Sequence, residues 1–378
     1  MIDYTVRPGD TFYTIADAFD ISPERLLSAN PEISDPNNVF VGQVIRIPEI
    51  YMRQIIEVNG FAFSNIDLGV LNATLPYLTY LSLYSYQVLP DGSLVGIDDT
   101  HLIPIARKAM VAPLMVVTNI VASAGFSSSL AHTILTDFQV QHTFLENVVR
   151  ILAQKDYYGL NIDFEYVLPD DRLAYGWFLK TVTERLGPLG YITCVTVAPK
   201  IGPGQLGIQY EAYEYSAIGF FVDRVIISTY EWGYAFGPPL AVSPINQVRQ
   251  TIQYAISVMP SQIILMGMPN YGHDWTLPLQ AYSAARILSF NEAEALAKSA
   301  EAYVKFDPEM QVSYFNYVDS MGLEHVVWFD NEMGIRSRLK LVEDYNLAGV
   351  SFWTINNFSP ASYQTLNTMY DVRKVLEA

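Results

Sequence analysis

The sequence predicts an α/β protein: a (β/α)₈ TIM barrel with a small α+β insertion, preceded by a small strand–helix–helix–strand domain. Two observations predict the barrel. From residue 54 onward strand patterns alternate with helical patterns, and there are eight such strands. One strand also carries a row of polar side chains along a single face. The eight strand patterns span residues 55–63, 80–86, 113–120, 160–166, 192–198, 224–230, 263–268 and 349–353.

The N-terminal domain is predicted to span residues 1–48. A strand at Tyr4 to Val6 is followed by a helix with Phe12 and Ile15 on its apolar side, a second helix, and a closing strand at 44–47. A linker at 49–53 then leads into the second domain, residues 49–378. Such a short tether restricts relative motion. The insertion is expected at about 275–335, with a helix at 291–302 and a hairpin formed by 311–318 and 325–329.

The N-terminal domain resembles a LysM module over its whole length. The matching segments are Val6-Arg7-Pro8-Gly9-Asp10-Thr11, Asn30-Pro31 and Val41-Gly42-Gln43. The resemblance implies binding of N-acetylglucosamine-containing glycans. It places the contacts on the loops that carry Gly9, Asp10, Thr11, Phe12, Asn30, Pro31 and Ile33. The alternative is that these residues only shape turns, and for Gly9 and Pro31 both interpretations can hold.

Residues 158–166 are the stretch around which the second domain is organised. On a strand, Leu160 and Ile162 point to one face, whereas Asn161, Asp163 and Glu165 point to the other. An alternating strand of this kind is typical of an antiparallel edge with one face in water. Amphipathic helix patterns before and after it instead favour a parallel βαβ strand with both faces covered. Acids on such a face, at the point where the strand ends, indicate catalysis.

This strand resembles the signature of glycoside hydrolase family 18, Asp-Gly-x-Asp-x-Asp-x-Glu. Tyr158 and Asn161 replace the first two acids, and Asp163 and Glu165 retain the last two. The variant is most similar to the branch that carries LysM modules and degrades spore peptidoglycan. Because Asn161 removes a like charge, we expect Asp163 to ionise more easily than in a strand with three acids.

The resemblance implies catalytic roles for Glu165, Asp163, Asn161 and Tyr230. Glu165 is the general acid and then the base, and Asp163 orients the substrate's acetamido group. The segment that ends in Tyr230-Glu231 matches the family's Met-x-Tyr-Asp segment, with Ser228 in place of Met and Glu231 in place of Asp. The resemblance also implies substrate contacts, which fall on Trp353, Tyr271, Glu231 and Asn119. Read from spacing alone, Tyr230 and Trp353 are equally consistent with core residues.

Composition narrows the classes of partner. The net charge of −17 argues against nucleic acid and anionic membranes, and the 26 tyrosines permit a neutral glycan as ligand. The five histidines are scattered and the single cysteine, Cys194, lies in an apolar strand. We therefore expect no metal site and no cofactor. No secretory signal or membrane-spanning run is visible.

These observations lead to one main hypothesis and two alternatives. We expect a monomeric N-acetylglucosaminidase that acts on peptidoglycan or a chitin-like glycan by a retaining, substrate-assisted mechanism. It would be located in the spore coat or cortex, or in the cell wall. A chitinase is the alternative enzyme. The alternative without turnover is a glycan-binding lectin or a structural spore-coat protein, against which the retained Asp163 and Glu165 argue.

Overall fold

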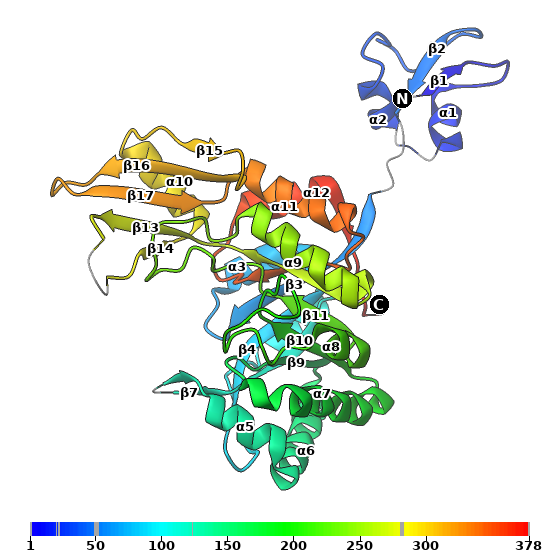
Figure 1. Cartoon of the computed structure of the whole chain (residues 1–378). Coiled ribbons are helices and arrows are strands. Elements are labelled where there is room, and N and C mark those ends of the chain that lie inside the picture. Colours follow the sequence, from blue (N-terminus) through cyan, green and yellow to red (C-terminus); the bar gives the residue numbers. More distant parts are fainter. Residues whose placement is uncertain are drawn as a thin grey trace. The chain divides into compact units, whose positions relative to one another are not determined.

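The computed structural model describes residues 2–19, 21, 23–48, 53–122, 124–279 and 283–376. The chain divides into two compact units, residues 1–53 and 54–378 (Figure 1). Most of the expected linker, residues 49–52, lies outside the described residues. No helix in the described ranges is both long enough and apolar enough to cross a membrane.

The first unit is built on a two-stranded antiparallel sheet. Strands β1 (Ile2–Thr5) and β2 (Val44–Ile47) pair, and the helices α1 (Phe12–Ala18) and α2 (Pro23–Ser28) lie between them in the chain. Thr11 caps α1 by accepting a hydrogen bond from the Thr14 amide, and the Thr14 side chain reaches back to the Thr11 amide. The unit has a core of its own, formed by Val6, Phe12, Ile15, Ala16, Ile21, Leu26, Ile33, Ile45 and Ile47.

The second unit is a closed barrel of eight parallel strands, which confirms the predicted fold. The strands are β3 (Gln54–Phe63), β4 (Tyr80–Val88), β6 (Ala112–Thr118), β9 (Gly159–Asp163), β10 (Ile192–Val197), β11 (Arg224–Ile227), β12 (Ile264–Pro269) and β18 (Gly349–Trp353). Neighbouring strands pair in parallel around the barrel, and β3 pairs with both β18 and β4, which closes it. All five residues of β9 are buried between β6 and β10, so the alternative of a solvent-facing antiparallel edge is wrong.

Helices cover the outside of the barrel (Figure 1). They are α3 (Leu68–Thr74), α4 (Leu102–Lys108), α5 (Ser128–Thr136), α6 (Phe138–Lys155), α7 (Arg172–Leu186), α8 (Tyr215–Phe221), α9 (Ile245–Val258), α11 (Glu332–Asp344) and α12 (Pro360–Met369). The longest, α6, begins after Asp137, whose side chain accepts hydrogen bonds from two backbone amides, and buries Phe144, Val148 and Leu152. These residues recur at helical spacing, which is why the chain folds back onto the sheet before β9 begins.

The insertion forms a separate sheet beside the barrel (Figure 1). Its order is β14 (Arg286–Leu288), β13 (Gly272–Leu277), β17 (Glu324–Phe329), β16 (Val312–Val318) and β15 (Lys305–Asp307), all antiparallel, with α10 (Phe290–Ser299). The insertion therefore begins at Gly272, directly after β12. Short additional strands are β5 (Leu94–Val95), β7 (Ile120–Val121), β8 (Gly125–Phe126) and β19 (Tyr370–Val372).

A buried acid stabilises the end of the barrel at which the strands begin. Glu57 on β3 is 3% exposed, and the Arg224 guanidinium on β11 donates to its two carboxylate oxygens at 2.5 and 2.7 Å. Tyr80 and Arg373 add longer bonds of 3.2 and 3.4 Å. A buried carboxylate is costly unless it is paired, so Glu57 needs these partners. Its bonds connect strands from opposite sides of the barrel with each other and with the C-terminal segment.

We predict that Arg224→Met destabilises the fold by about 3 kcal/mol, because it leaves Glu57 buried with only its weaker partners. Urea unfolding followed by circular dichroism measures the change. Arg185→Met is the control: Arg185 bonds Glu146 at 3.0 Å, but both side chains are substantially exposed, so the loss should stay below about 1 kcal/mol. Equal losses for the two variants would contradict the prediction.

Candidate active site

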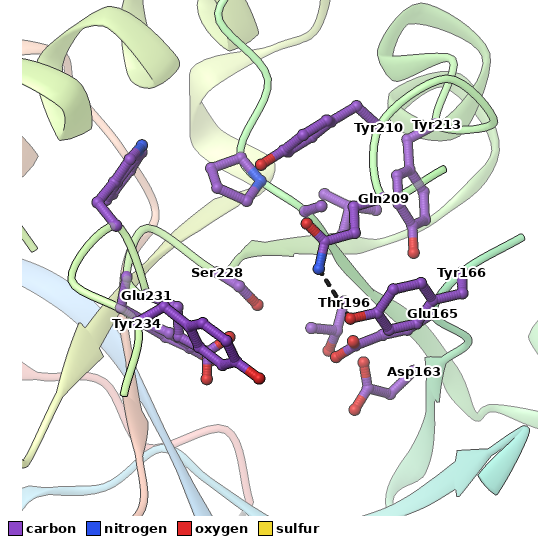
Figure 2. Close-up of a pocket in the computed structure, with 15 residues that line it drawn as sticks. Asp163, Glu165, Tyr166, Thr196, Gln209, Tyr210, Tyr213, Ser228, Glu231 and Tyr234 are labelled. Atoms are coloured by element: carbon purple, nitrogen blue, oxygen red, sulfur yellow. Dashed lines mark hydrogen bonds between the residues drawn. The ribbon is translucent and has the colours of Figure 1, made fainter. Parts of the chain in front are cut away.

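A cleft of about 380 Å³ opens at the end of the barrel where strands β9, β10 and β11 finish. Its walls come from the last residues of β9 and β10 and from the loops that follow the three strands. The lining residues are Asp163, Glu165, Tyr166, Thr196, Val197, Ala198, Pro199, Gln209, Tyr210, Tyr213, Ser228, Tyr230, Glu231, Trp232 and Tyr234. Asp163, Glu165 and Tyr166 lie on one side in Figure 2, and Glu231 and Tyr234 on the other.

Asp163 and Glu165 lie together in the cleft (Figure 2). Asp163 is the last residue of β9 and only 4% exposed, and its Oδ1 atom has no hydrogen-bond partner among the described residues. Glu165 lies two residues further on and is half-buried. A buried carboxylate oxygen without a partner is costly, so it indicates an atom reserved for a ligand.

Burial changes the acidity of these groups. The pKa of Asp163 is raised to about 7, and loss of surrounding water is the main cause. A hydrogen bond with Tyr84 acts in the opposite direction, and the charge of the nearby Glu231 raises the pKa further. The pKa of Glu165 is raised well above its usual value, by burial first and then by the charges of Asp163 and Glu231. Because Asp163 raises the pKa of Glu165, the pair favours an ionised Asp163 beside a protonated Glu165 near neutral pH.

Glu231, at the mouth of the cleft, is a third acid. Its side chain retains exposed surface, yet the loss of surrounding water raises its pKa. Its backbone is left-handed, with φ of 71°, directly after Tyr230. The sharp turn lets two consecutive side chains both line the cleft.

Asn161 is fully buried and does not line the cleft. Its amide exchanges hydrogen bonds with the Thr196 hydroxyl at 3.1 and 3.3 Å, and Thr196 does line it. The loss of an acid at this position does not leave Asp163 with an ordinary pKa, because burial outweighs the missing charge. Asn161 therefore contacts the cleft through Thr196.

The aromatic residues expected to bind substrate form one cluster behind the carboxylates. Tyr230, Tyr271 and Val242 are buried together with the half-buried Trp353 packed against them. Of these, only Tyr230 lines the cleft. The Trp353 ring meets Tyr84 edge-on at 4.9 Å between centroids and is in similar contact with Phe61 at 5.3 Å. The Tyr271 hydroxyl is buried without a partner among the described residues.

Asn119 occupies a different place from the one expected of a substrate-binding residue. It follows β6, is fully buried and does not line the cleft. Its side-chain amide bonds the backbone of Glu165 through two contacts of 2.8 and 3.0 Å. A third contact of 3.0 Å goes to the Ser127 carbonyl.

The loop after β10 contributes wall residues that the sequence analysis did not single out. Gln209 donates a hydrogen bond to the Tyr166 hydroxyl at 2.9 Å (Figure 2). The Tyr213 hydroxyl donates to the Phe164 carbonyl at 2.7 Å. The only sequence signal for this wall is the cluster of aromatic and polar residues at 209–215, in a loop without periodicity. Trp232 and Tyr234 complete the opposite wall.

In the first unit, the residues implicated in glycan binding divide into exposed and structural ones. Gly9 (φ 95°), Thr11 and Pro31 are exposed. Asp10 accepts bonds from the Tyr4 hydroxyl at 2.7 Å and the Arg7 amide at 2.8 Å.

The other residues in the set are buried. Phe12, Asn30 and Ile33 are at most 7% exposed. Asn30 bonds both the amide and the carbonyl of Arg46, so it ties the turn after α2 to strand β2.

A barrel of eight parallel strands with paired buried acids at the strand ends and an aromatic-walled cleft defines a glycosidase of the TIM-barrel class. Comparison with known proteins identifies the family. Residues 105–357 match the model for glycosyl hydrolases family 18, and residues 4–48 match the LysM domain. The chain belongs to glycosyl hydrolases family 18 and carries a glycan-binding LysM domain.

Relatives agree with this assignment. The chain is 37% identical to the cortical fragment-lytic enzyme of Bacillus cereus, covering 82% of this chain and 73% of that protein. It is 35% identical to the enzyme of the same name from Bacillus subtilis (strain 168), covering 98% of each. The crystal structure of the Bacillus cereus spore cortex-lytic enzyme SleL matches with a TM-score of 0.84 and 34% identity, covering 100% of this chain and 88% of that one.

We predict that Asp163→Asn stabilises the protein above pH 7 and has little effect near pH 4. The folded pKa of Asp163 is raised, so its contribution to stability is full below the unfolded value of about 4 and is lost as pH rises through about 7. An asparagine cannot ionise, so the variant keeps its stability as the pH rises through 7. Thermal unfolding at pH 4 and pH 8 measures it.

The exposed Asp170→Asn is the control and should change the melting temperature equally at both pH values. An Asp163→Asn variant that is no more stable than the wild type at pH 8 would contradict the prediction.

Proposed function

We propose that this protein hydrolyses β-linked N-acetylglucosamine glycan of bacterial cell-wall or spore-cortex peptidoglycan, with retention of configuration and participation of the substrate. The observation that carries the proposal is that the buried Asp163 and the half-buried Glu165 line the cleft together, with one Asp163 oxygen unpartnered among the described residues. The names of the similar Bacillus proteins, cortical fragment-lytic and spore cortex-lytic enzymes, support this substrate class.

In the first step the acetamido oxygen of the substrate attacks its own anomeric carbon. The glycosidic C–O bond breaks, and Glu165 gives its proton to the leaving oxygen. Burial favours the protonated form of Glu165, because it raises the pKa of this group. No protein carboxylate needs to bond the sugar, which distinguishes this route from that of most retaining glycosidases.

Asp163 stabilises the cyclic, positively charged intermediate. Its free Oδ1 accepts the acetamido N–H, and its negative charge offsets the charge that develops on nitrogen. Water then attacks the anomeric carbon from the face that the leaving group vacated. Glu165, now ionised, takes the proton from that water and is restored. Two inversions give net retention.

The remaining site residues have supporting roles in this proposal. The Tyr230 hydroxyl contacts the acetamido carbonyl, and Glu231 binds sugar hydroxyls at the cleft mouth. Trp353 and Tyr271 form the apolar floor behind Tyr230. Thr196, which bonds Asn161, also lines the cleft.

Chitin cleavage is the second candidate, because the proposed chemistry requires only an N-acetylhexosamine at the reacting position. Product analysis on purified cortex fragments and on chitin oligosaccharides separates the two. The LysM domain supports attachment to the cell wall or spore, and we propose that the spore cortex or coat is where the enzyme acts.

We predict that Glu165→Gln lowers kcat on soluble N-acetylglucosamine oligosaccharides by about 10²–10⁴-fold, because the amide cannot donate the proton. Glycan binding, measured by calorimetry, should persist. Substrates with a free amine at the reacting sugar should resist the wild-type enzyme, because they lack the attacking oxygen. Rapid cleavage of such an amine would make a protein carboxylate the nucleophile.

We predict that removing residues 1–48 leaves activity on soluble oligosaccharides nearly unchanged and lowers activity on insoluble walls. The barrel closes through β3 and β4 without the first unit, and each unit has its own apolar core. A tethered binding domain acts by raising the local concentration of an immobile substrate. Sedimentation with cell walls measures adsorption. Equal losses on both substrates, in a folded truncation, would assign the first unit a part in the cleft.

A further inference from the structure

The acid Glu165 lies outside the sheet that positions the other strand-end residues. Strand β9 ends at Asp163, and its pairing with β6 ends there too, where Thr118 is opposite Asp163. Backbone hydrogen bonds of the barrel therefore fix Asp163 but not Glu165. Something other than the strand ladder must hold the Glu165 peptide, because its side chain cannot be aimed more accurately than its backbone.

Asn119 supplies that support. Its Nδ2 donates to the Glu165 carbonyl at 2.8 Å, and its Oδ1 accepts from the Glu165 amide at 3.0 Å. The backbone N–H and the backbone carbonyl of Glu165 are thus both held by one side chain. Nδ2 also donates to the Ser127 carbonyl at 3.0 Å, and the Ser127 amide donates to the Asn119 carbonyl at 3.0 Å. Asn119 is fully buried, so water does not compete for these bonds.

The carbonyls on either side of Glu165 are held in the same way. The Tyr213 hydroxyl donates to the Phe164 carbonyl at 2.7 Å, and the Ser128 hydroxyl donates to the Tyr166 carbonyl at 2.6 Å. Three side chains from three separate parts of the chain therefore take the place of the missing strand pairing. Of these, Asn119 contacts the peptide of Glu165 itself.

We propose that Asn119 is a positioning residue for the acid Glu165, which it orients by binding both ends of that residue's backbone; this rests on the proposed role of Glu165. A primary amide suits the task because it offers a donor and an acceptor about 2 Å apart on one plane. An aspartate keeps the shape and the acceptor but loses both donated bonds. A leucine keeps the approximate volume and loses all the bonds.

The test compares Asn119→Asp and Asn119→Leu with the wild type on a soluble N-acetylglucosamine oligosaccharide. We expect kcat to fall on the order of 10–100-fold in Asn119→Leu, because a misplaced acid costs about that much, while KM stays within about twofold. The basic limb of the pH–rate profile, which reports the proton on Glu165, should shift. In a Glu165→Gln background, the same leucine should cause no further loss of kcat.

Thr79→Val is the matched control. Thr79 is also fully buried and also bridges an amide and a carbonyl, those of Val58 and Arg373, but at the opposite end of the barrel. It should lower the melting temperature and leave kcat and the pH profile unchanged. Asn119 variants that lower only the melting temperature would overturn the proposal, as would equal losses in the two Glu165 backgrounds.

Two different outcomes separate the positioning role of Asn119 from the catalytic role of Glu165. If Glu165→Gln retains full activity, the acid is elsewhere and the proposed function fails. If Glu165→Gln is inactive while Asn119→Asp and Asn119→Leu both keep the wild-type kcat, only the positioning role fails. If Asn119→Leu does not fold, Asn119→Asp carries the test, since it retains one of the two bonds to Glu165.

Discussion

The structure depends on the burial of carboxylates at the carboxyl end of β9. Strand β9 lies between two parallel strands, so its residue Asp163 is buried, and a buried carboxylate is costly unless a partner or a ligand binds it. The same burial raises the pKa of both Asp163 and Glu165, which keeps a proton available near neutral pH. Burial of the two carboxylates therefore lowers the stability of the fold and also raises the pKa values on which the proposed chemistry depends.

The two ends of the barrel treat buried acids in opposite ways. Where the strands begin, Glu57 is matched by the Arg224 guanidinium and stabilises the closure. Where they finish, none of the described residues that line the cleft is a cation, and the Asp163 Oδ1 atom has no partner among the described residues. The paired Glu57 contributes to the stability of the fold. The unpaired Asp163 oxygen lowers stability but remains available to bind a ligand.

Support for the acid comes from residues distant in sequence. Asn119, Ser128 and Tyr213 bind consecutive carbonyls beyond β9, although they belong to three different parts of the chain. The wall opposite is formed by the turn after β11, where the left-handed Glu231 directs two side chains into the same space. The cleft is therefore assembled by loops on a rigid barrel, as expected for this fold.

The sequence by itself determined the barrel, the insertion and a small strand–helix–helix–strand domain, because alternating apolar patterns and turn residues report local structure directly. The resemblance of its turn segments to the family pattern identified that domain as a LysM module. It also singled out Asp163 and Glu165, because period-two alternation places them on one face. Only the tertiary structure decided the place of Asn119 and the wall formed by Gln209, Tyr210 and Tyr213. Their positions follow from loops without periodicity and from contacts between residues 43 or more positions apart, such as Asn119 with Glu165 and Gln209 with Tyr166, which no local pattern encodes.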